Sequence, residues 1–191
     1  GYPYGTFELS PSQVPDLNWK LRGYAYFNDH FLYLMWQNEM TGQIAAWKMG
    51  GDGTIRLDGR LLTPSEVPDT NWRIVGIADF NWDGHSDLVW QHQTSGLIPV
   101  WYMKGLTRTA GELLSPGQVL DTNWKIRAVA DVNEDYHPDL IWQHQTTGLI
   151  AAWLMKGLQR VDGLLLSPDR ITDTNWRIVG TGWRDPWECW Y

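Results

Sequence analysis

The sequence predicts an all-β fold, namely a β-propeller of about four blades with about four antiparallel strands each. The main observation is a repeat, because the dipeptide Asn-Trp recurs at intervals of 53, 52 and 52 residues. Two further tryptophan series keep this spacing, and a fixed period of about 50 residues is typical of arrays of one supersecondary unit. The recurring tryptophans are Trp19, Trp36, Trp47, Trp72, Trp90, Trp101, Trp124, Trp142, Trp153 and Trp176.

The second unit illustrates the strands that we expect. Residues 71–79, 87–93 and 97–103 are short runs rich in Val, Ile and Trp, and a weaker run ends at 112–116. Runs of this composition, separated by turns rich in Gly, Asp and Ser, are typical of strands. No window of the chain shows the apolar period of an amphipathic helix, so we expect almost no helix.

The repeat predicts one domain over residues 1–191, because a single unit of about 50 residues cannot bury its own apolar face. Complete units span residues 18–70, 71–122 and 123–174. Residues 1–17 match the last strand of a unit, and residues 175–191 begin with a match to its first strand. The two ends of the chain could share one blade and close a ring. Alternatively, a neighbouring chain could complete each half in a head-to-tail polymer.

The turn between the first and second strands carries oxygen ligands at alternate positions in two units. The second unit reads Asp79-x-Asn81-x-Asp83-Gly84-x-x-Asp87, and the third reads Asp131-x-Asn133-x-Asp135-x-x-x-Asp139. Hard oxygens in this number suit Ca²⁺, and the backbone carbonyl of His85 or His137 would add one more. We therefore expect two structural Ca²⁺ sites. The alternative is an Asp- and Asn-rich turn without an ion, in which each Asp caps the backbone.

The two acidic loops differ from each other and from the remaining units. Tyr136 takes the place of Gly84, so the second loop reaches its bend at a steric cost. The first unit reads Tyr26-x-Asn28-Asp29-His30 and the last opens on Trp183, so we expect no Ca²⁺ in either. Two bound Ca²⁺ ions would bring the formal charge from −7 to −3, because each adds two positive charges.

Composition excludes several classes of function. The net charge is −7 and the sequence has no cluster of Lys or Arg, which argues against a nucleic-acid partner. No apolar run approaches the roughly 18 residues of a membrane span, and no charged and then apolar leader opens the chain. We therefore expect either a mature form or a protein made without a leader. Cys189 is the single cysteine, so it is either a small buried side chain or an interchain bridge in a secreted oligomer.

The segments ADFNWDGHSDLVWQHQTSGLIPVWYMKG and ADVNEDYHPDLIWQHQTTGLIAAWLMKG resemble the FG-GAP/VCBS-type repeats of bacterial extracellular proteins and, more distantly, those of integrin α-chain propellers. The resemblance covers nearly the whole chain. It implies an extracellular β-propeller with calcium in the inter-strand loops and a role in binding or cell adhesion. Several lectins share this blade type, so the resemblance extends to carbohydrate binding.

Candidate glycan-binding residues are polar residues that follow a tryptophan in the second and third units, together with three tryptophans. Sugars are bound by stacking on an aromatic ring and by hydrogen bonds from hydroxyls to amides and imidazoles. The candidates are Trp82, Gln91, His92, Trp101, Gln143, His144 and Trp153. The alternative is that these polar residues only satisfy strand ends and turns. Trp183, Trp187 and Trp190 also lie outside the repeat, and Trp187 and Trp190 are expected at a blade junction or a subunit interface.

The sequence does not predict an enzyme. It contains no HExxH cluster, no Gly-x-Ser-x-Gly elbow and no phosphate-binding loop. We therefore expect a non-catalytic, calcium-stabilised extracellular module that binds carbohydrate. The alternative is a self-assembling structural subunit of an extracellular filament or homo-oligomer, joined through the split blade.

Overall fold

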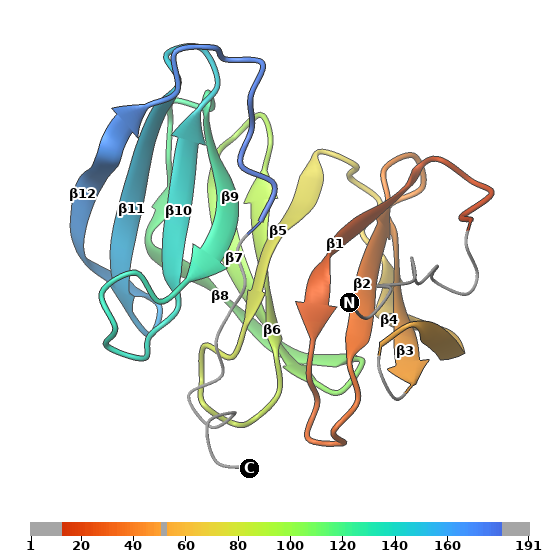
Figure 1. Cartoon of the computed structure of the whole chain (residues 1–191). Coiled ribbons are helices and arrows are strands. Elements are labelled where there is room, and N and C mark those ends of the chain that lie inside the picture. The colour runs from red at the N-terminus through yellow and green to blue at the C-terminus, as the bar shows by residue number, and fades with distance from the viewer. Residues whose placement is uncertain (1–12, 51–52, 181–191) are drawn as a thin grey trace, which may run out of the picture.

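The computed structural model describes residues 13–50 and 53–180, which form twelve β-strands and no helix (Figure 1). The prediction of an all-β fold is confirmed. No helix in these residues is long and apolar enough to cross a membrane.

Each complete repeat unit forms a four-stranded antiparallel meander, which we call the first, second and third sheet. The first sheet contains β1 (Trp19–Ala25), β2 (Tyr33–Asn38), β3 (Gln43–Gly50) and β4 (Ile55–Glu66). The second contains β5 (Trp72–Ala78), β6 (Asp87–His92), β7 (Leu97–Lys104) and β8 (Thr107–Gln118). The third contains β9 (Trp124–Ala130), β10 (Asp139–His144), β11 (Leu149–Lys156) and β12 (Gln159–Arg170).

Turn chemistry explains where these strands begin and end. Each unit opens on an Asp-x-Asn-Trp turn, and in the second unit Asp69 Oδ1 accepts hydrogen bonds from the backbone and side-chain nitrogens of Asn71 at 2.9 Å. The turn between β6 and β7 contains Gly96, whose φ is +76°. A Cβ there would lie 1.9 Å from the carbonyl oxygen of Val119, so this turn requires glycine.

The hydrophobic core lies between adjacent sheets. One cluster joins apolar residues of the first and second sheets, and a second cluster joins those of the second and third. Trp90 and Trp142 belong to these clusters, and both are 1% exposed. Strands β6 and β10 are buried along almost their whole length, as expected for strands covered on both faces.

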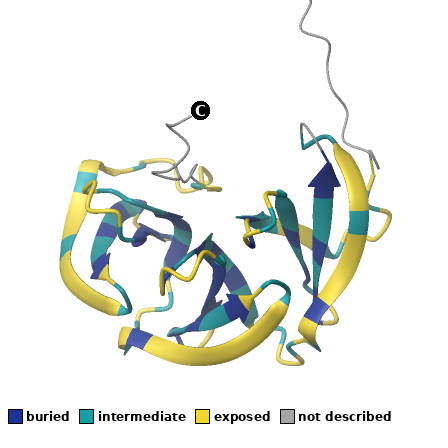
Figure 2. Ribbon diagram, turned by 90° about the horizontal axis from the view of Figure 1, so that it is seen from below, coloured by how far each residue is buried: buried dark blue, intermediate teal, exposed yellow. Residues whose placement is uncertain are grey.

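The outer strands β4, β8 and β12 are exposed over most of their length and lie at the rim of an arc of three sheets (Figure 2). Single parallel pairs, Thr63 with Thr107 and Ser115 with Gln159, join the twelve strands into one mixed sheet. The backbone N–H of Thr63 donates to the carbonyl oxygen of Leu106 at 2.9 Å, and that of Ser115 donates to the carbonyl oxygen of Leu158 at the same distance. The outer strand of one sheet therefore contacts the turn before the outer strand of the next sheet.

The split unit at the two ends of the chain is only partly described. Residues 1–12 and 181–191, and with them Cys189, Trp183, Trp187 and Trp190, lie outside the described residues. Residues 175–180, expected as a first strand, form no strand in the structure. A strand requires a hydrogen-bonded neighbour, and residues 186–191, which would have to supply a second strand for this unit, lie outside the described residues.

Candidate functional site

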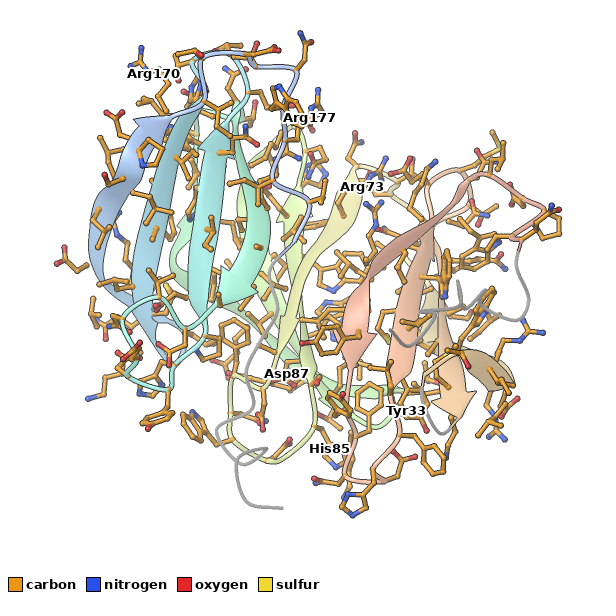
Figure 3. The ribbon with its side chains drawn as sticks, in the orientation of Figure 1. Tyr33, Arg73, His85, Asp87, Arg170 and Arg177 are labelled. Carbon is orange, nitrogen blue, oxygen red and sulfur yellow. The ribbon has the colours of Figure 1, made fainter. Side chains whose placement is uncertain are left out.

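The two acidic loops, residues 79–87 and 131–139, connect the first and second strands of the second and third sheets. Figure 3 places Asp87 and His85 at the same end of the molecule as Tyr33 of the first sheet. Strand β5 ends at Ala78, where the run of apolar residues gives way to Asp79. The candidate metal ligands of one loop therefore share one short segment of chain, as the sequence predicts.

Hydrogen bonds within the loop hold the side chain of Asp79. Its Oδ1 accepts from the backbone nitrogen of Trp82 at 2.6 Å, and its Oδ2 accepts from that of Gly84 at 2.7 Å. Asp83 Oδ1 accepts from the backbone nitrogen of His85 at 2.9 Å, and Asn81 Nδ2 donates to Asp83 Oδ2 at 3.1 Å. These contacts form a tight turn in which Trp82 takes a φ of +63°.

Asp87 is fully buried at the start of β6 and ties its loop to β7. Its Oδ2 accepts from the backbone nitrogen of Phe80 at 3.0 Å, and its Oδ1 accepts from that of Met103 at 2.9 Å. Burial raises the pKa of Asp87 to about 7, and the nearby carboxylates of Asp79 and Asp83 act in the same direction. A buried carboxylate with like charges around it is destabilised unless a cation or a proton compensates it.

The third sheet repeats this arrangement. Asp139 is fully buried and accepts from the backbone nitrogens of Val132 and Met155 at 3.0 and 2.8 Å. Burial raises the pKa of Asp139, with Asp135 and Asp131 contributing. Tyr136 takes a φ of +66°, the left-handed conformation that Gly84 adopts in the other loop. The bend at Tyr136 therefore carries the steric cost expected from the sequence.

The chemistry of both loops fits Ca²⁺, although their carboxylates do not converge. Among the described residues, no three His, Cys, Asp or Glu side chains lie close enough to hold a metal ion. A carboxylate oxygen has two acceptor positions, so the backbone hydrogen bonds of Asp79 and Asp87 leave room for an ion. No Lys, Arg or His in the described part of the chain pairs with any of the six loop carboxylates.

The loop of the first sheet contains a cation of its own. Tyr33 stands where the other sheets have Asp87 and Asp139, and its hydroxyl donates to Asp29 Oδ2 at 2.7 Å. Lys48 Nζ lies 3.0 Å from the same oxygen and 3.7 Å from the centre of the Phe31 ring. The unit for which the sequence predicts no Ca²⁺ thus has an ammonium group beside its loop carboxylate.

Neighbouring loops contact each other. Trp82 is 54% exposed, and its ring meets that of His137 edge to face with centroids 5.5 Å apart. His137 Nδ1 is buried and has no hydrogen-bond partner. On the other side, Asn28 Nδ2 donates to the carbonyl oxygen of Asp83 at 3.2 Å. The three loops therefore form one continuous surface at this end of the molecule.

The candidate glutamines lie between sheets rather than on a surface. Gln91 is 1% exposed, and its Nε2 donates to the Trp124 carbonyl oxygen at 3.0 Å while its Oε1 accepts from Ile126 N at 3.2 Å. Gln143 makes the same two contacts to Trp176 and Ile178 at 2.9 and 3.2 Å. Each glutamine therefore links its sheet to the chain segment that follows.

The candidate histidines stabilise the turns that open each unit. His92 Nε2 lies 2.9 Å from Asp69 Oδ2, and its Nδ1 accepts from the backbone nitrogen of Ser95 at 3.0 Å. His144 pairs with Asp121 at 3.0 Å in the same way. Since both ring nitrogens are engaged, these histidines have no hydrogen bond to offer a ligand without breaking the turn.

Trp101 and Trp153 are each held between a tryptophan and an arginine. The ring centroids of Trp101 and Trp90 lie 4.7 Å apart, and the guanidinium of Arg108 lies 4.4 Å from the Trp101 ring. Trp153 repeats this with Trp142 and Arg160 at 4.7 and 4.9 Å. Of the seven ligand candidates, Trp82 is the one with more than half of its surface exposed.

A cavity of about 500 Å³ lies between the first sheet and the β7–β8 turn, and the sequence analysis missed it. Its polar lining comes from Asp29, Tyr33, Lys48, Asp58 and Arg60. Sequence could have indicated it, because Lys48 aligns with Tyr102 and Leu154, and Arg60 aligns with Glu112 and Leu164. These charges are departures from the repeat, and the fold does not require them.

The chain was compared with protein-family models, with curated protein sequences and with solved structures, and it matches none of them.

Proposed function

We propose that this chain is a non-catalytic extracellular binding module, built as a β-propeller whose acidic loops are stabilised by two Ca²⁺ ions and whose ligand is a carbohydrate. The proposal is supported by three sheets of one design that lie along an arc, with inner strands β1, β5 and β9 next to each other. It is also supported by the resemblance of the repeats to FG-GAP/VCBS-type units. Ring closure would require a further unit made from the two ends of the chain.

The observation that carries the calcium proposal is the contrast between the loops. The loop of the first sheet has Lys48 beside its carboxylate. The loops of the second and third sheets bury Asp87 and Asp139, with no cation paired to them in the described residues. The ligands would be Asp79, Asn81, Asp83 and Asp87, with the His85 carbonyl, and Asp131, Asn133, Asp135 and Asp139, with the His137 carbonyl. A bound ion would compensate these charges and fix each loop.

A binding role is favoured over catalysis because four groups suited to acid–base chemistry already have structural partners. His92 and His144 are engaged in turns through both ring nitrogens. The buried carboxylates Asp87 and Asp139 accept backbone hydrogen bonds. An enzyme would require a further pair of opposed groups in a cleft.

Two surfaces support carbohydrate as the ligand. Trp82 is an exposed aromatic ring on a loop, and rings of this kind stack on sugars. The cavity beside the first loop has a volume suited to a small ligand and combines the Tyr33 ring with acceptors on Asp58 and donors on Arg60. Arg60 Nε lies 2.7 Å from Asp58 Oδ2, so both groups are oriented before a ligand arrives.

The test is glycan-array binding by the whole chain and by three variants. Trp82→Ala and Arg60→Leu are each expected to weaken the strongest signals about five- to thirtyfold, since each removes a contact of about 1–2 kcal/mol. Arg170→Leu is the matched control, because it makes the same charge change at an exposed arginine of the third sheet. An array without any signal, or signals equal in all four proteins, would count against carbohydrate as the ligand.

A second candidate is a self-assembling subunit joined through the split unit. It is favoured by residues 176–178, which accept and donate the same hydrogen bonds with Gln143 that an inner strand makes with Gln91. These residues nevertheless form no strand in the described part of the chain. Light scattering after size-exclusion chromatography distinguishes the two candidates. A filament subunit gives species of many chains that grow with concentration, whereas a single closed module gives one mass of 22.1 kDa.

A further inference from the structure

Besides the exposed Lys20, five cationic side chains lie on or beside the inner strands, mainly at the end opposite the acidic loops. They come from the positions one and three residues after the repeating tryptophans, and they are Arg22, Arg73, Lys125, Arg127 and Arg177. Figure 3 shows Arg73 and Arg177 at the end of the molecule opposite Asp87 and His85. The pKa of Arg22 and that of Arg127 are both lowered, first by burial and then by a neighbouring arginine. Like charges of this kind need a compensating anion.

The first pair of arginines has its own carboxylate. Glu39 Oε1 lies 2.8 Å from Arg22 Nη2 and 3.5 Å from Arg73 Nε. Arg22 Nε also donates to Gln37 Oε1 at 3.1 Å. At the junction between the first and second sheets, one glutamate therefore holds two guanidinium groups that come from neighbouring inner strands.

Arg127 and Arg177 repeat the arrangement of Arg22 and Arg73 two junctions further along. Gln143 forms hydrogen bonds with residues 176 and 178, as Gln37 does with residues 72 and 74, so Arg177 corresponds to Arg73. The residue that corresponds to Glu39 is Gln145, because the backbone nitrogen of each donates to the first Asn of its unit at 2.9 Å. The second pair therefore lacks the carboxylate of the first.

The consequence is visible in the contacts of Arg127. Its Nε is buried and has no hydrogen-bond partner, unlike Arg22 Nε. The pKa of neighbouring Lys125 is lowered by burial and by Arg127, and Lys125 Nζ donates to the carbonyl oxygen of Gln93 at 3.0 Å. Within residues 13–50 and 53–180, no carboxylate forms an ion pair with Lys125, Arg127 or Arg177.

We propose that Arg127 and Arg177 bind a carboxylate group supplied from outside the described chain, at the position that Glu39 occupies in the first sheet. A guanidinium presents N–H donors in a planar fork that matches the two oxygens of a carboxylate. The buried Nε of Arg127 supplies one such donor, and the exposed guanidinium of Arg177 leaves the position open on one side. This inference does not depend on carbohydrate being the ligand of the protein.

The experiment is an NMR titration of the side-chain Nε–H signals of arginine with sodium acetate, at constant ionic strength set with chloride. The signals of Arg127 and Arg177 are expected to shift together and to saturate, with a Kd on the order of 10 mM for a single carboxylate held by two guanidinium groups. The signal of Arg108, which stacks on Trp101, is the internal control and stays unchanged.

Two matched variants each introduce at one junction the residue that the other junction contains. Gln145→Glu places in the third sheet the carboxylate that Glu39 supplies in the first, so it is expected to raise Tm and to reduce the acetate shifts at least tenfold. Glu39→Gln is expected to lower Tm and to make Arg22 and Arg73 respond to acetate as Arg127 and Arg177 do. Both variants keep the size of the side chain, so neither disturbs the packing.

Four outcomes would overturn the assignment. The first is an unchanged acetate response in Gln145→Glu, and the second is a fall in its Tm. The third is a response to inorganic phosphate but not to acetate, which would mark a phosphate site instead of a carboxylate site. A shift of all arginine signals in parallel would show general ion screening and would equally contradict a site at Arg127 and Arg177.

Discussion

Gln91 shows at the scale of one residue how adjacent sheets are joined. Its amide is buried and satisfies the Trp124 carbonyl and the Ile126 N–H, two backbone groups of β9. A buried backbone group that loses its partner destabilises the fold by about 1–3 kcal/mol. One side chain therefore stabilises the junction through two hydrogen bonds.

We predict that Gln91→Ala lowers the free energy of unfolding by about 2–4 kcal/mol, because two buried groups lose their partner and a cavity remains. Urea denaturation measures the change. Gln118→Ala is the control, since Gln118 is exposed and its Nε2 donates to the Ser95 carbonyl oxygen, which water can satisfy. The control is expected to lose less than about 0.5 kcal/mol, and equal losses in the two variants would contradict this role of Gln91.

The sequence identified Gln91 and His92 as candidate ligand-binding residues, but it could not show whether their side chains face the surface or a neighbouring part of the chain. Their position after Trp90 suggested a polar surface beside an aromatic ring, whereas the partners of Gln91 lie 33 and 35 residues further along the chain. A contact of this kind depends on how one unit packs on the next, and the periodicity of a single unit does not contain it. Trp82 was easier to interpret because it interrupts the repeat inside a loop, and it is indeed exposed.

At the scale of the element, the β6–β7 turn shows why glycine recurs at this place in each unit. Gly96 combines a φ of +76° with a backbone oxygen 1.9 Å from where a Cβ would be, whereas Gly105 has a φ of +59° and open space. The first position therefore has both a conformational and a steric reason for glycine, and the second has only the conformational one.

We predict that Gly96→Ala destabilises the protein by at least about 2 kcal/mol more than Gly105→Ala. Both variants bear the strain of a left-handed alanine, which costs about 1–2 kcal/mol. Only Gly96→Ala must also push the segment of Val119 away from its hydrogen bond with Gly96. Chemical denaturation of the two variants measures the difference, and similar losses would show that the turn adapts more easily than its geometry indicates.

The Asp-x-Asn-Trp turn predicts a response to acid. The pKa of Asp69 is lowered to about 2, first by the backbone N–H of Asn71 and then by His92. A carboxyl group whose pKa is lower in the folded state stabilises the fold above about pH 4, the unfolded pKa, and this contribution is lost as pH falls through about 2. The pKa of Asp121 is lowered by the same kind of contacts.

We therefore expect Asp69→Asn to have a lower Tm than the wild type at about pH 5, with a gap that shrinks by at least half at about pH 2. Asparagine keeps an oxygen for the N–H of Asn71 but carries no charge. Thermal melts monitored by circular dichroism at several pH values provide the measurement. Asp162→Asn, an exposed residue of β12, serves as the control. A gap independent of pH would exclude the charge of Asp69 as its cause.

At the scale of the whole molecule, the repeat made the strand order predictable while the spatial grouping of charges was not. The number and the order of strands in each unit follow from alternating short apolar runs and turn residues. The cations at the inner strands are spread from residue 22 to residue 177, so no local cluster announces them. Comparing equivalent positions between units reveals the difference in charge, because Glu39 stands where the other units have Gln93 and Gln145 with the same backbone contact.

The same comparison between units supports the proposal of Ca²⁺ in the two acidic loops. Three loops lie at one end of the molecule, one with Lys48 beside its carboxylate and two with buried, uncompensated aspartates. Hydrogen bonds hold each acidic turn in its conformation. The repulsion between its carboxylates is the reason that such a turn would need an ion. Calcium and not packing would then set the stability of the two acidic loops.

The most direct measurement is the thermal unfolding midpoint in about 1 mM Ca²⁺ against chelator, together with the binding stoichiometry from calorimetry. A ligand at 100 times its Kd stabilises by about 2.7 kcal/mol per site, which corresponds to a rise in Tm of about 5–10 °C for a chain of this length. We expect about twice that rise from two sites in the wild type, and one site in Asp83→Ala. An unchanged midpoint in wild-type protein, or no heat of binding, would contradict calcium-stabilised loops.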